Sequence, residues 1–231
     1  MRESRIRYRI VPGRARFIAN VEFTNYTNAE LLQLIEENID VLDETALLRA
    51  ATLVKENDQK IELYKKAADK FGCNAAQYNL AVTYLNMDEN NKVKEALNKC
   101  EKDADWNNAM GALALREGDY AQAARYFAAA GNETAKENLA VLDVLNGKYN
   151  DAAAKLAGKT GYNAALVALL NGNNAPAAAL KCECPQAAYL RAVAAARQGN
   201  AAAVASNLEA AKACEKLAAR AAKDIEFAQY R

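Results

Sequence analysis

Residues 110–127 read MGALALREGDYAQAARYF, and this stretch decides the fold of the chain. Gly118 divides it into two runs whose small and apolar residues follow helical spacing. Gly111 stands seven residues before Gly118, Ala123 stands five residues after it, and Phe127 stands nine residues after it. Related spacing recurs around three later glycines: Gly147, Gly172 and Gly199.

The four glycines lie 29, 25 and 27 residues apart, which indicates an internal repeat. The residues seven positions earlier are all small: Gly111, Ala140, Ala165 and Ala192. The residues five positions later are small or β-branched: Ala123, Ala152, Ala177 and Val204. Nine positions later, three of the four repeats carry a large apolar residue: Phe127, Leu156 and Leu208. The remaining repeat places Lys181 there, beside Leu180.

This spacing predicts helix pairs that cross where the small residues stand. The glycine ends the first helix of each pair in a left-handed conformation, which a residue with a Cβ resists. The predicted helix pairs are 74–87 with 91–101, 105–117 with 119–130, 133–146 with 149–157, 162–171 with 174–181, and 186–198 with 200–213. A final helix over 215–230 is expected to close the stack.

The N-terminus follows a different pattern. Residues 5–11 alternate charged and apolar side chains, which predicts a short β-like strand that ends at Pro12 and Gly13. Thr27 and Glu30 form a capping-box pattern that starts the helical region. We therefore expect two parts, a basic strand-like segment or linker over 1–26 and a helical repeat domain over 27–231. The predicted fold class is all-α, an α-α superhelix with that short β-like segment.

Composition removes several classes of function. The chain has no histidine, the commonest general base and metal ligand, so we expect no catalytic residue, no metal and no cofactor. The net charge of +1 gives no reason to expect nucleic acid as a partner. No run approaches the roughly 18–20 apolar residues that a membrane span needs, so no membrane span is expected.

The five cysteines are an odd number, so they cannot all pair within one chain. Buried, inert thiols are the expected state for them. Cys182 and Cys184 are too close together to form a zinc site without further ligands. One disulfide remains open if the compartment is oxidising.

The 110–127 stretch, followed by Ala130, resembles the tetratricopeptide repeat in its small, small, aromatic, small pattern. The stretch from Asn138 to Ala152 matches that pattern less fully, and the later repeats are shorter and lack the closing proline. The resemblance implies a TPR-like solenoid. Such a stack presents an extended concave surface that binds a protein or peptide.

Four further stretches resemble the tetratricopeptide-bearing C-terminal regions of OmpA-like envelope proteins of Bacteroidetes. They are 26–32 (YTNAELL), 50–57 (AATLVKEN), 189–197 (YLRAVAAAR) and 224–230 (DIEFAQY). The resemblance implies a periplasmic, outer-membrane-associated protein, in which the N-terminal strand associates with a preceding envelope domain. Cytoplasmic localisation is the alternative.

In tetratricopeptide proteins, an asparagine two positions before the small residue often contacts the backbone of a bound peptide. The resemblance therefore implies partner contacts at Asn79, Asn138 and Asn163. An amide suits this role because it both donates and accepts hydrogen bonds. The alternative is that these asparagines bond within the scaffold or face water.

Two arginines occupy the position five residues after the small residue, namely Arg116 and Arg197. They are candidates for binding a partner carboxylate. The alternative is that they are solvated cations at helix ends, where the helix dipole favours them.

The sequence thus favours a non-catalytic scaffold that binds a protein or peptide partner on its concave face. A structural spacer or oligomerisation arm of a larger envelope protein is the second hypothesis. An enzyme would have to rely on carboxylates, and the acid pairs Asp103/Asp105 and Asp88/Glu89 are its candidates. Each pair is better explained by helix capping.

Overall fold

The computed structural model describes residues 26–230, and all their regular structure is helical. The predicted all-α fold is therefore confirmed for this part of the chain. The predicted strand over 5–11 and its turn lie outside the described residues. The described residues form two compact units, 26–135 and 136–230, which we call the N-terminal unit and the C-terminal unit.

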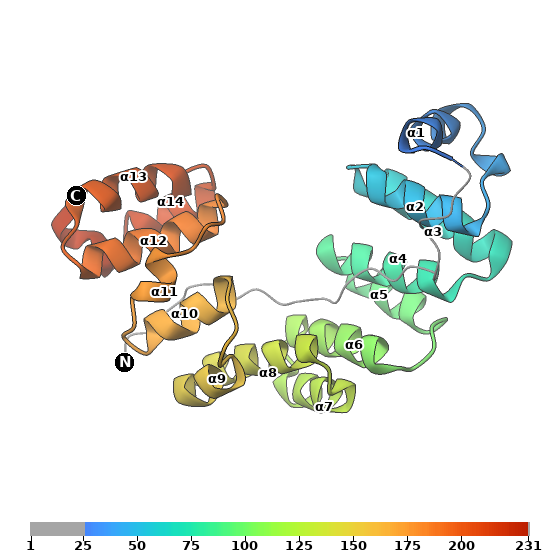
Figure 1. The fold of residues 1–231 in the computed structure, drawn as a ribbon. Helices are drawn as coiled ribbons and strands as arrows, with labels where there is room; N and C mark the ends of the chain where they lie inside the picture. The colour runs from blue at the N-terminus through green and yellow to red at the C-terminus, as the bar shows by residue number, and fades with distance from the viewer. Residues whose placement is uncertain (1–25, 231) are drawn as a thin grey trace. The chain divides into compact units, whose positions relative to one another are not determined.

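The N-terminal unit is a stack of consecutive antiparallel helices (Figure 1). Its elements are α1 (Asn28–Glu37), a 3-10 turn η2 (Ile39–Val41), α2 (Glu44–Leu53), α3 (Asn57–Phe71), α4 (Asn74–Asn86), α5 (Asn90–Leu97), α6 (Ala104–Arg116) and α7 (Tyr120–Ala130). Each helix packs on the next along the chain, and α4 also contacts α6, the first helix of the following pair. This neighbour-on-neighbour packing is typical of a repeat stack.

The C-terminal unit continues the same scheme. Its elements are most of α8 (Glu133–Leu145), α9 (Tyr149–Lys155), α10 (Tyr162–Leu170), α11 (Ala175–Ala178), α12 (Pro185–Arg197), α13 (Ala201–Ala211), α14 (Glu215–Ala221) and the 3-10 segment η3 (Ile225–Tyr230). Within it α10 contacts α12, and α12 contacts α13, α14 and η3. Each unit is thus a stack of helix pairs, the superhelical architecture expected from the sequence.

The capping box at the start of the helical region is confirmed. The backbone N–H of Thr27 donates to the Glu30 carboxylate at 2.6 Å. In return, the backbone N–H of Glu30 donates to the Thr27 hydroxyl at 3.3 Å. The two bonds satisfy backbone donors that have no partner inside the first turn of α1.

The small residues do lie where helices cross. Ala140, Ala165 and Ala192 are at most 1% exposed, and Ala140 packs with Leu156 in one apolar cluster. A Cβ added to Gly111 would lie 2.5 Å from two ring carbons of Phe127. Close approach of the paired helices therefore depends on a missing or minimal side chain at these positions.

The turn between the two helices of a repeat has one geometry throughout. Four glycines have a positive φ, between +72° and +84°, and the next residue donates its N–H to the carbonyl five positions earlier, at 2.8–3.0 Å. This 6→1 bond is the Schellman arrangement. The four glycines are Gly118, Gly147, Gly172 and Gly199.

The predicted pair 74–87 with 91–101, which has no glycine at its turn, shares the same turn geometry. Asp88 has φ +62°, and the N–H of Glu89 donates to the Tyr84 carbonyl at 3.0 Å. Around Asp88, buried Ala81, Val93 and Leu97 stand at the positions −7, +5 and +9. The pattern was hidden because aspartate, which tolerates the left-handed region better than most residues, replaces glycine.

Asp88 provides a test of this shared turn. We expect Asp88→Gly to be more stable than Asp88→Ala by about 1 kcal/mol, because both lose the carboxylate but only alanine keeps the left-handed strain. Urea denaturation of the two variants measures the difference. At exposed Lys92 inside α5, the matched pair Lys92→Gly and Lys92→Ala should show the opposite order. Equal stabilities of the two Asp88 variants would contradict the left-handed turn.

Ala140 provides a test of the crossings. We expect Ala140→Leu to lower the free energy of unfolding by roughly 1–3 kcal/mol, because the larger side chain overpacks the contact between α8 and its neighbours. The control is Ala202→Leu on exposed Ala202 of α13, which should stay within about 0.5 kcal/mol of the parent chain. A neutral Ala140→Leu in the same denaturation experiment would mean that no helix crosses there.

The expected single helix over 215–230 is wrong in one respect. The chain breaks between α14 and η3, over residues 222–224. Asp224 starts the 3-10 segment, because its carboxylate accepts the N–H of Glu226 at 3.1 Å and its carbonyl accepts the N–H of Phe227 at 3.2 Å. An aspartate that bonds the following backbone competes with continued helix.

Candidate functional site

The three asparagines singled out as partner contacts all lie in first helices of repeats, on α4, α8 and α10. They are buried, with exposed fractions of 1% for Asn79, 0% for Asn138 and 5% for Asn163. The Asn163 amide donates to the Glu137 carboxylate at 3.0 Å, which links α10 to the preceding first helix. In the chain as described, these amides belong to the helix interfaces, and their contact with a partner stays a prediction.

Arg116, in the N-terminal unit, lies at the end of α6 and reaches the preceding repeat. Its Nη1 donates to the Leu85 carbonyl in the last turn of α4 and pairs with the Asp88 carboxylate at 2.8 Å. A guanidinium at this point adds a second donor to a helix-end carbonyl that already accepts the N–H of Asp88 at 3.2 Å, and it complements the helix dipole. Arg116 thus ties two successive repeats together.

Arg197, in the C-terminal unit, makes the equivalent contact. Its Nη1 donates to the Leu169 carbonyl in the last turn of α10 at 2.7 Å. Leu169 stands three residues before Gly172, just as Leu85 stands three residues before Asp88. The other edge of the guanidinium holds the Glu226 carboxylate through Nε and Nη2, with the shortest contact at 2.7 Å. Arg197 therefore binds a carboxylate, and that carboxylate belongs to the chain's own C-terminal segment.

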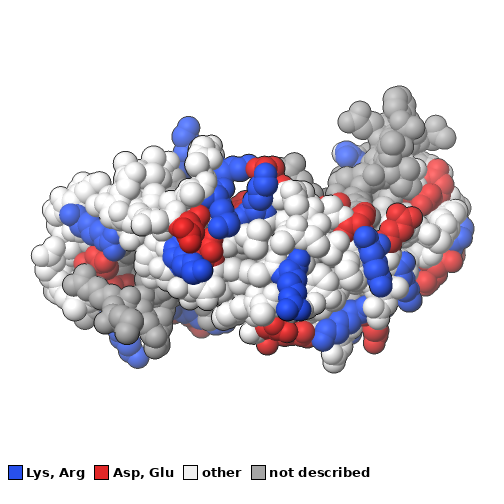
Figure 2. Space-filling model, turned by 90° about the horizontal axis from the view of Figure 1, so that it is seen from below, with Lys and Arg blue, Asp and Glu red and all other residues white. Residues whose placement is uncertain are grey.

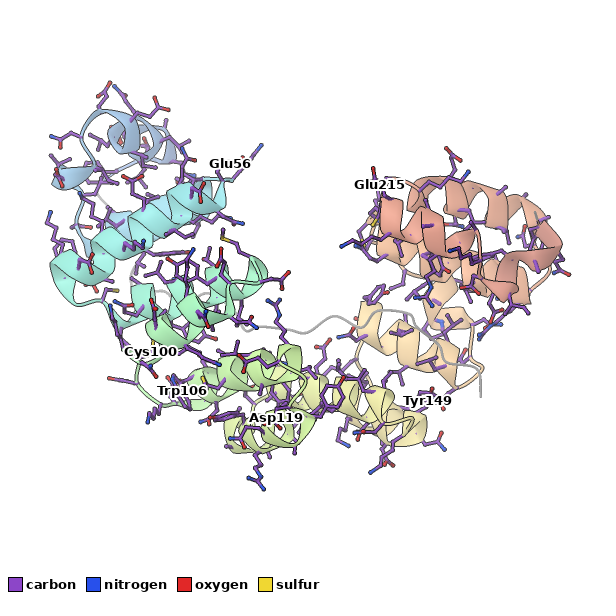
Figure 3. The ribbon with its side chains drawn as sticks, turned by 180° about the vertical axis from the view of Figure 1, so that it is seen from behind. Glu56, Cys100, Trp106, Asp119, Tyr149 and Glu215 are labelled. Atoms are coloured by element: carbon purple, nitrogen blue, oxygen red, sulfur yellow. A yellow bond between two sulfur atoms is a disulfide. The ribbon has the colours of Figure 1, made fainter. Side chains whose placement is uncertain are left out.

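The C-terminal segment 224–230 forms a cluster of aromatic and charged side chains with α12 and α14, and it was not predicted as a site. Phe227 is 1% exposed, and its ring meets the Tyr189 ring edge-on at 5.6 Å. The Tyr230 hydroxyl donates to the Ala196 carbonyl at 2.9 Å. Ala196 again stands three residues before the left-handed glycine, so Tyr230 donates to the carbonyl position that an arginine contacts in two other repeats. Figure 3 labels Glu215, where the adjoining helix α14 begins.

Tyr189 connects α12, α14 and this segment. Its hydroxyl donates to the Asp224 carboxylate at 2.5 Å and accepts from Arg220 Nε at 3.2 Å, while the Arg220 guanidinium lies over its ring. Burial of the ring and the hydrogen bond to Asp224 raise the pKa of Tyr189. The only sequence signal for this cluster was the run of two carboxylates and two aromatic rings in 224–230.

The acid pairs have structural partners. Asp103 caps α6, as expected, by accepting the backbone N–H of Trp106 at 2.9 Å, and Asp105 accepts from Asn132 at 3.5 Å. Asp88 pairs with Arg116, and Glu89 pairs with Lys92 at 3.3 Å. All four carboxylates thus contact other groups of the chain, and a side-chain cap is seen for Asp103.

A disulfide joins Cys182 and Cys184 in the loop between α11 and α12.

Cys73 is a buried thiol that caps α4, accepting the N–H of Ala76 at 3.4 Å. Burial raises the pKa of the Cys73 thiol to about 11, and its hydrogen bond to Glu44 adds to the shift. The prediction of a buried, inert thiol fits Cys73.

We expect Cys73 to be alkylated at least about ten-fold more slowly than half-buried Cys214 at pH 8, because only the thiolate reacts and the raised pKa leaves little of it. Peptide mass spectrometry after timed exposure to iodoacetamide measures both rates in one sample. In urea the two rates should converge. Equal rates in the folded chain would contradict the protected thiol.

On the face shown in Figure 2, basic and acidic side chains are interspersed without a field of one sign. Among residues 26–230, no group of three or more His, Cys, Asp or Glu could hold a metal ion. None of the described helices combines the length and the apolar character that crossing a membrane requires.

No protein-family model matches the chain, and a search of curated proteins finds no similar sequence.

Proposed function

We propose that this chain is a non-catalytic scaffold that binds a protein or peptide partner. The observation that carries the proposal is the repetition itself. Five helix pairs, two in the N-terminal unit and three in the C-terminal unit, share one turn geometry and one pattern of small residues. Stacks of this kind present a continuous surface to which one extended partner can bind.

We further propose that the repeats are of the tetratricopeptide type and that the protein belongs to the periplasmic side of an outer membrane. The pattern of residues 110–127 supports the first proposal, and the burial of Gly111, Ala123 and Phe127 in the N-terminal unit is compatible with it. The resemblance of four stretches to OmpA-like envelope proteins supports the second. Fractionating the source cells with an antibody against the chain tests the location, and recovery in the cytosol would refute it.

For the partner contacts we propose the first-helix positions Asn79, Asn138, Asn163, Arg116 and Arg197. The amides are buried in the described chain, so binding through them requires the partner to reach the crossings between first helices. Their removal should therefore affect both stability and binding. An unpaired buried group costs about 1–3 kcal/mol, and that loss must be measured beside the binding.

The experiment is a pull-down from envelope extract with the parent chain, Asn138→Ala and Asn163→Ala. The matched control is Asn91→Ala, which removes an exposed amide from the second helix α5. Each chain is used well below its own melting temperature, measured by circular dichroism. We expect one partner to be retained by the parent and by Asn91→Ala and to be lost from the other two. Equal retention by all four chains would refute these contacts.

One observation favours the alternative, a structural spacer of a larger envelope protein. Asn163, Arg116 and Arg197 all bind neighbouring helices of the chain itself. A spacer needs such internal ties and no partner on that face. A pull-down without a partner, together with a stability loss for each variant, would support the spacer.

A further inference from the structure

Residues 224–230, which we call the tail, lie on the C-terminal unit in the manner of a bound peptide. They follow α14 after two linking residues and contact α12 and α13. The surface that receives them, which we call the tail-docking surface, consists of Tyr189, the Ala196 carbonyl, Arg197 and Arg220.

An aromatic anchor holds the tail in place. Phe227 is 1% exposed, while Ile225, two residues earlier in the same segment, is 71% exposed. The surface thus selects one large side chain of the tail and leaves another in solvent. Selection of a single buried ring is typical of an anchor residue in peptide recognition.

Polar contacts fix the residues on both sides of that anchor. Arg197 holds the Glu226 carboxylate through Nε and Nη2, one edge of its guanidinium, and Tyr189 donates to Asp224 at 2.5 Å. The hydroxyl of Tyr230 reaches the Ala196 carbonyl at 2.9 Å. Together with the anchor, these contacts recognise a pattern of Asp-x-Glu-Phe-x-x-Tyr.

We propose that the tail-docking surface is a peptide-binding site for acidic segments with this aromatic anchor, and that the chain's own tail occupies it until such a segment from a partner competes. The proposal rests on the scaffold function proposed above and names the chemistry of one partner. Charge supports the choice of ligand, since Arg197 and Arg220 both face carboxylates of the tail.

Because the tail is covalently linked to α14, it occupies the tail-docking surface when no partner segment competes. A segment joined by two residues competes at an effective concentration of the order of millimolar, whereas a free segment competes only at its actual concentration. A partner segment therefore binds when its own contacts are stronger or when the tail is released. The contacts of Glu226 and Phe227 are the ones whose loss would release it.

The test uses a fluorescently labelled peptide of residues 222–230, AKDIEFAQY, and fluorescence polarisation. It is titrated with the full parent chain and with full-length Phe227→Ala, whose tail lacks the anchor while the residues of the tail-docking surface are unchanged. We expect the peptide to bind the variant at least about ten-fold more tightly than the parent, because the tethered competitor is weakened. A peptide with alanine in place of Phe227 should bind neither chain.

A second variant guards against loss of folding. Glu226→Lys keeps Phe227 in place, opposes Arg197 with a like charge, and should also admit the peptide. In addition, Arg197→Glu should bind a peptide with lysine at position 226 better than the native peptide. Folding of every chain is checked by its melting transition.

Absence of peptide binding to both Phe227→Ala and Glu226→Lys, with both chains folded, would overturn the inference. So would binding that is indifferent to the anchor. If a pull-down still recovers a partner sensitive to Asn138→Ala, the scaffold proposal stands while this site falls. If the peptide binds but no partner is recovered in that experiment, the inference stands and the first-helix contacts fall.

Discussion

Gly111→Ala is expected to destabilise the chain by about 1–2 kcal/mol, although alanine is the better helix former. The reason is the position of the missing Cβ, which would lie 2.5 Å from the ring carbons Cδ1 and Cε1 of Phe127. That ring is fully buried. Overpacking therefore outweighs the gain of roughly 1 kcal/mol in helix propensity. Urea denaturation measures the net change.

The neighbouring repeats supply the compensating substitution. Where the small residue is Ala140, the residue sixteen positions later is Leu156, and the two pack in one cluster. Where it is Gly111, the corresponding residue is the larger Phe127. The volumes on the two sides of the crossing thus vary in opposite directions, as close packing requires.

We therefore expect the double variant Gly111→Ala with Phe127→Leu to recover most of the lost stability. Phe127→Leu alone should cost roughly 1 kcal/mol through the space that it leaves. A coupling energy of at least about 1 kcal/mol between the two sites is the expected outcome of the cycle. Additive losses would mean that the two residues do not share the crossing.

The close approach of paired helices at such crossings explains which parts of the fold could be predicted from the sequence. Glycine and alanine at fixed distances report a backbone constraint, because only small side chains permit the approach and only glycine enters the left-handed turn without strain. Four helix pairs and the positions of their turns could be read from that constraint. Helical spacing predicted the fifth pair, 74–87 with 91–101, but not the left-handed position of its turn, because Asp88 meets the same constraint at a modest cost.

The candidate site was harder to predict, because its contacts link residues far apart in the sequence. Arg116 and Arg197 were recognised as a pair, yet their acceptors, Leu85 and Leu169, lie 31 and 28 residues away. The acceptor is a backbone carbonyl, which every residue type has. The sequence therefore contains no pattern that identifies the helix-end carbonyl to which each arginine donates. Helical spacing likewise extended the last helix through the tail, since it does not register the side-chain bond with which Asp224 starts a new turn.

Phe227→Ala is expected to have the largest effect of any single substitution in the C-terminal unit, a loss of about 3–5 kcal/mol in the free energy of unfolding. Phe227 is fully buried, belongs to the main apolar cluster of that unit, and supplies the edge-on partner of Tyr189. Its removal leaves a cavity in that cluster. The remaining tail contacts, those of Asp224, Glu226 and Tyr230, are polar and lie nearer the solvent.

Ile225→Ala is the matched control, because it removes a comparable apolar side chain from the same segment at a position that is 71% exposed. It should change the unfolding free energy by no more than about 0.5 kcal/mol. Both variants are compared by urea denaturation followed by circular dichroism, and hydrogen exchange of α12 amides locates the loss. The tail acts as a folded end of the stack only if exchange in α12 rises with Phe227→Ala and stays unchanged with Ile225→Ala. Equal, small effects of the two substitutions would show that the tail contributes nothing to the stability of the helices beneath it.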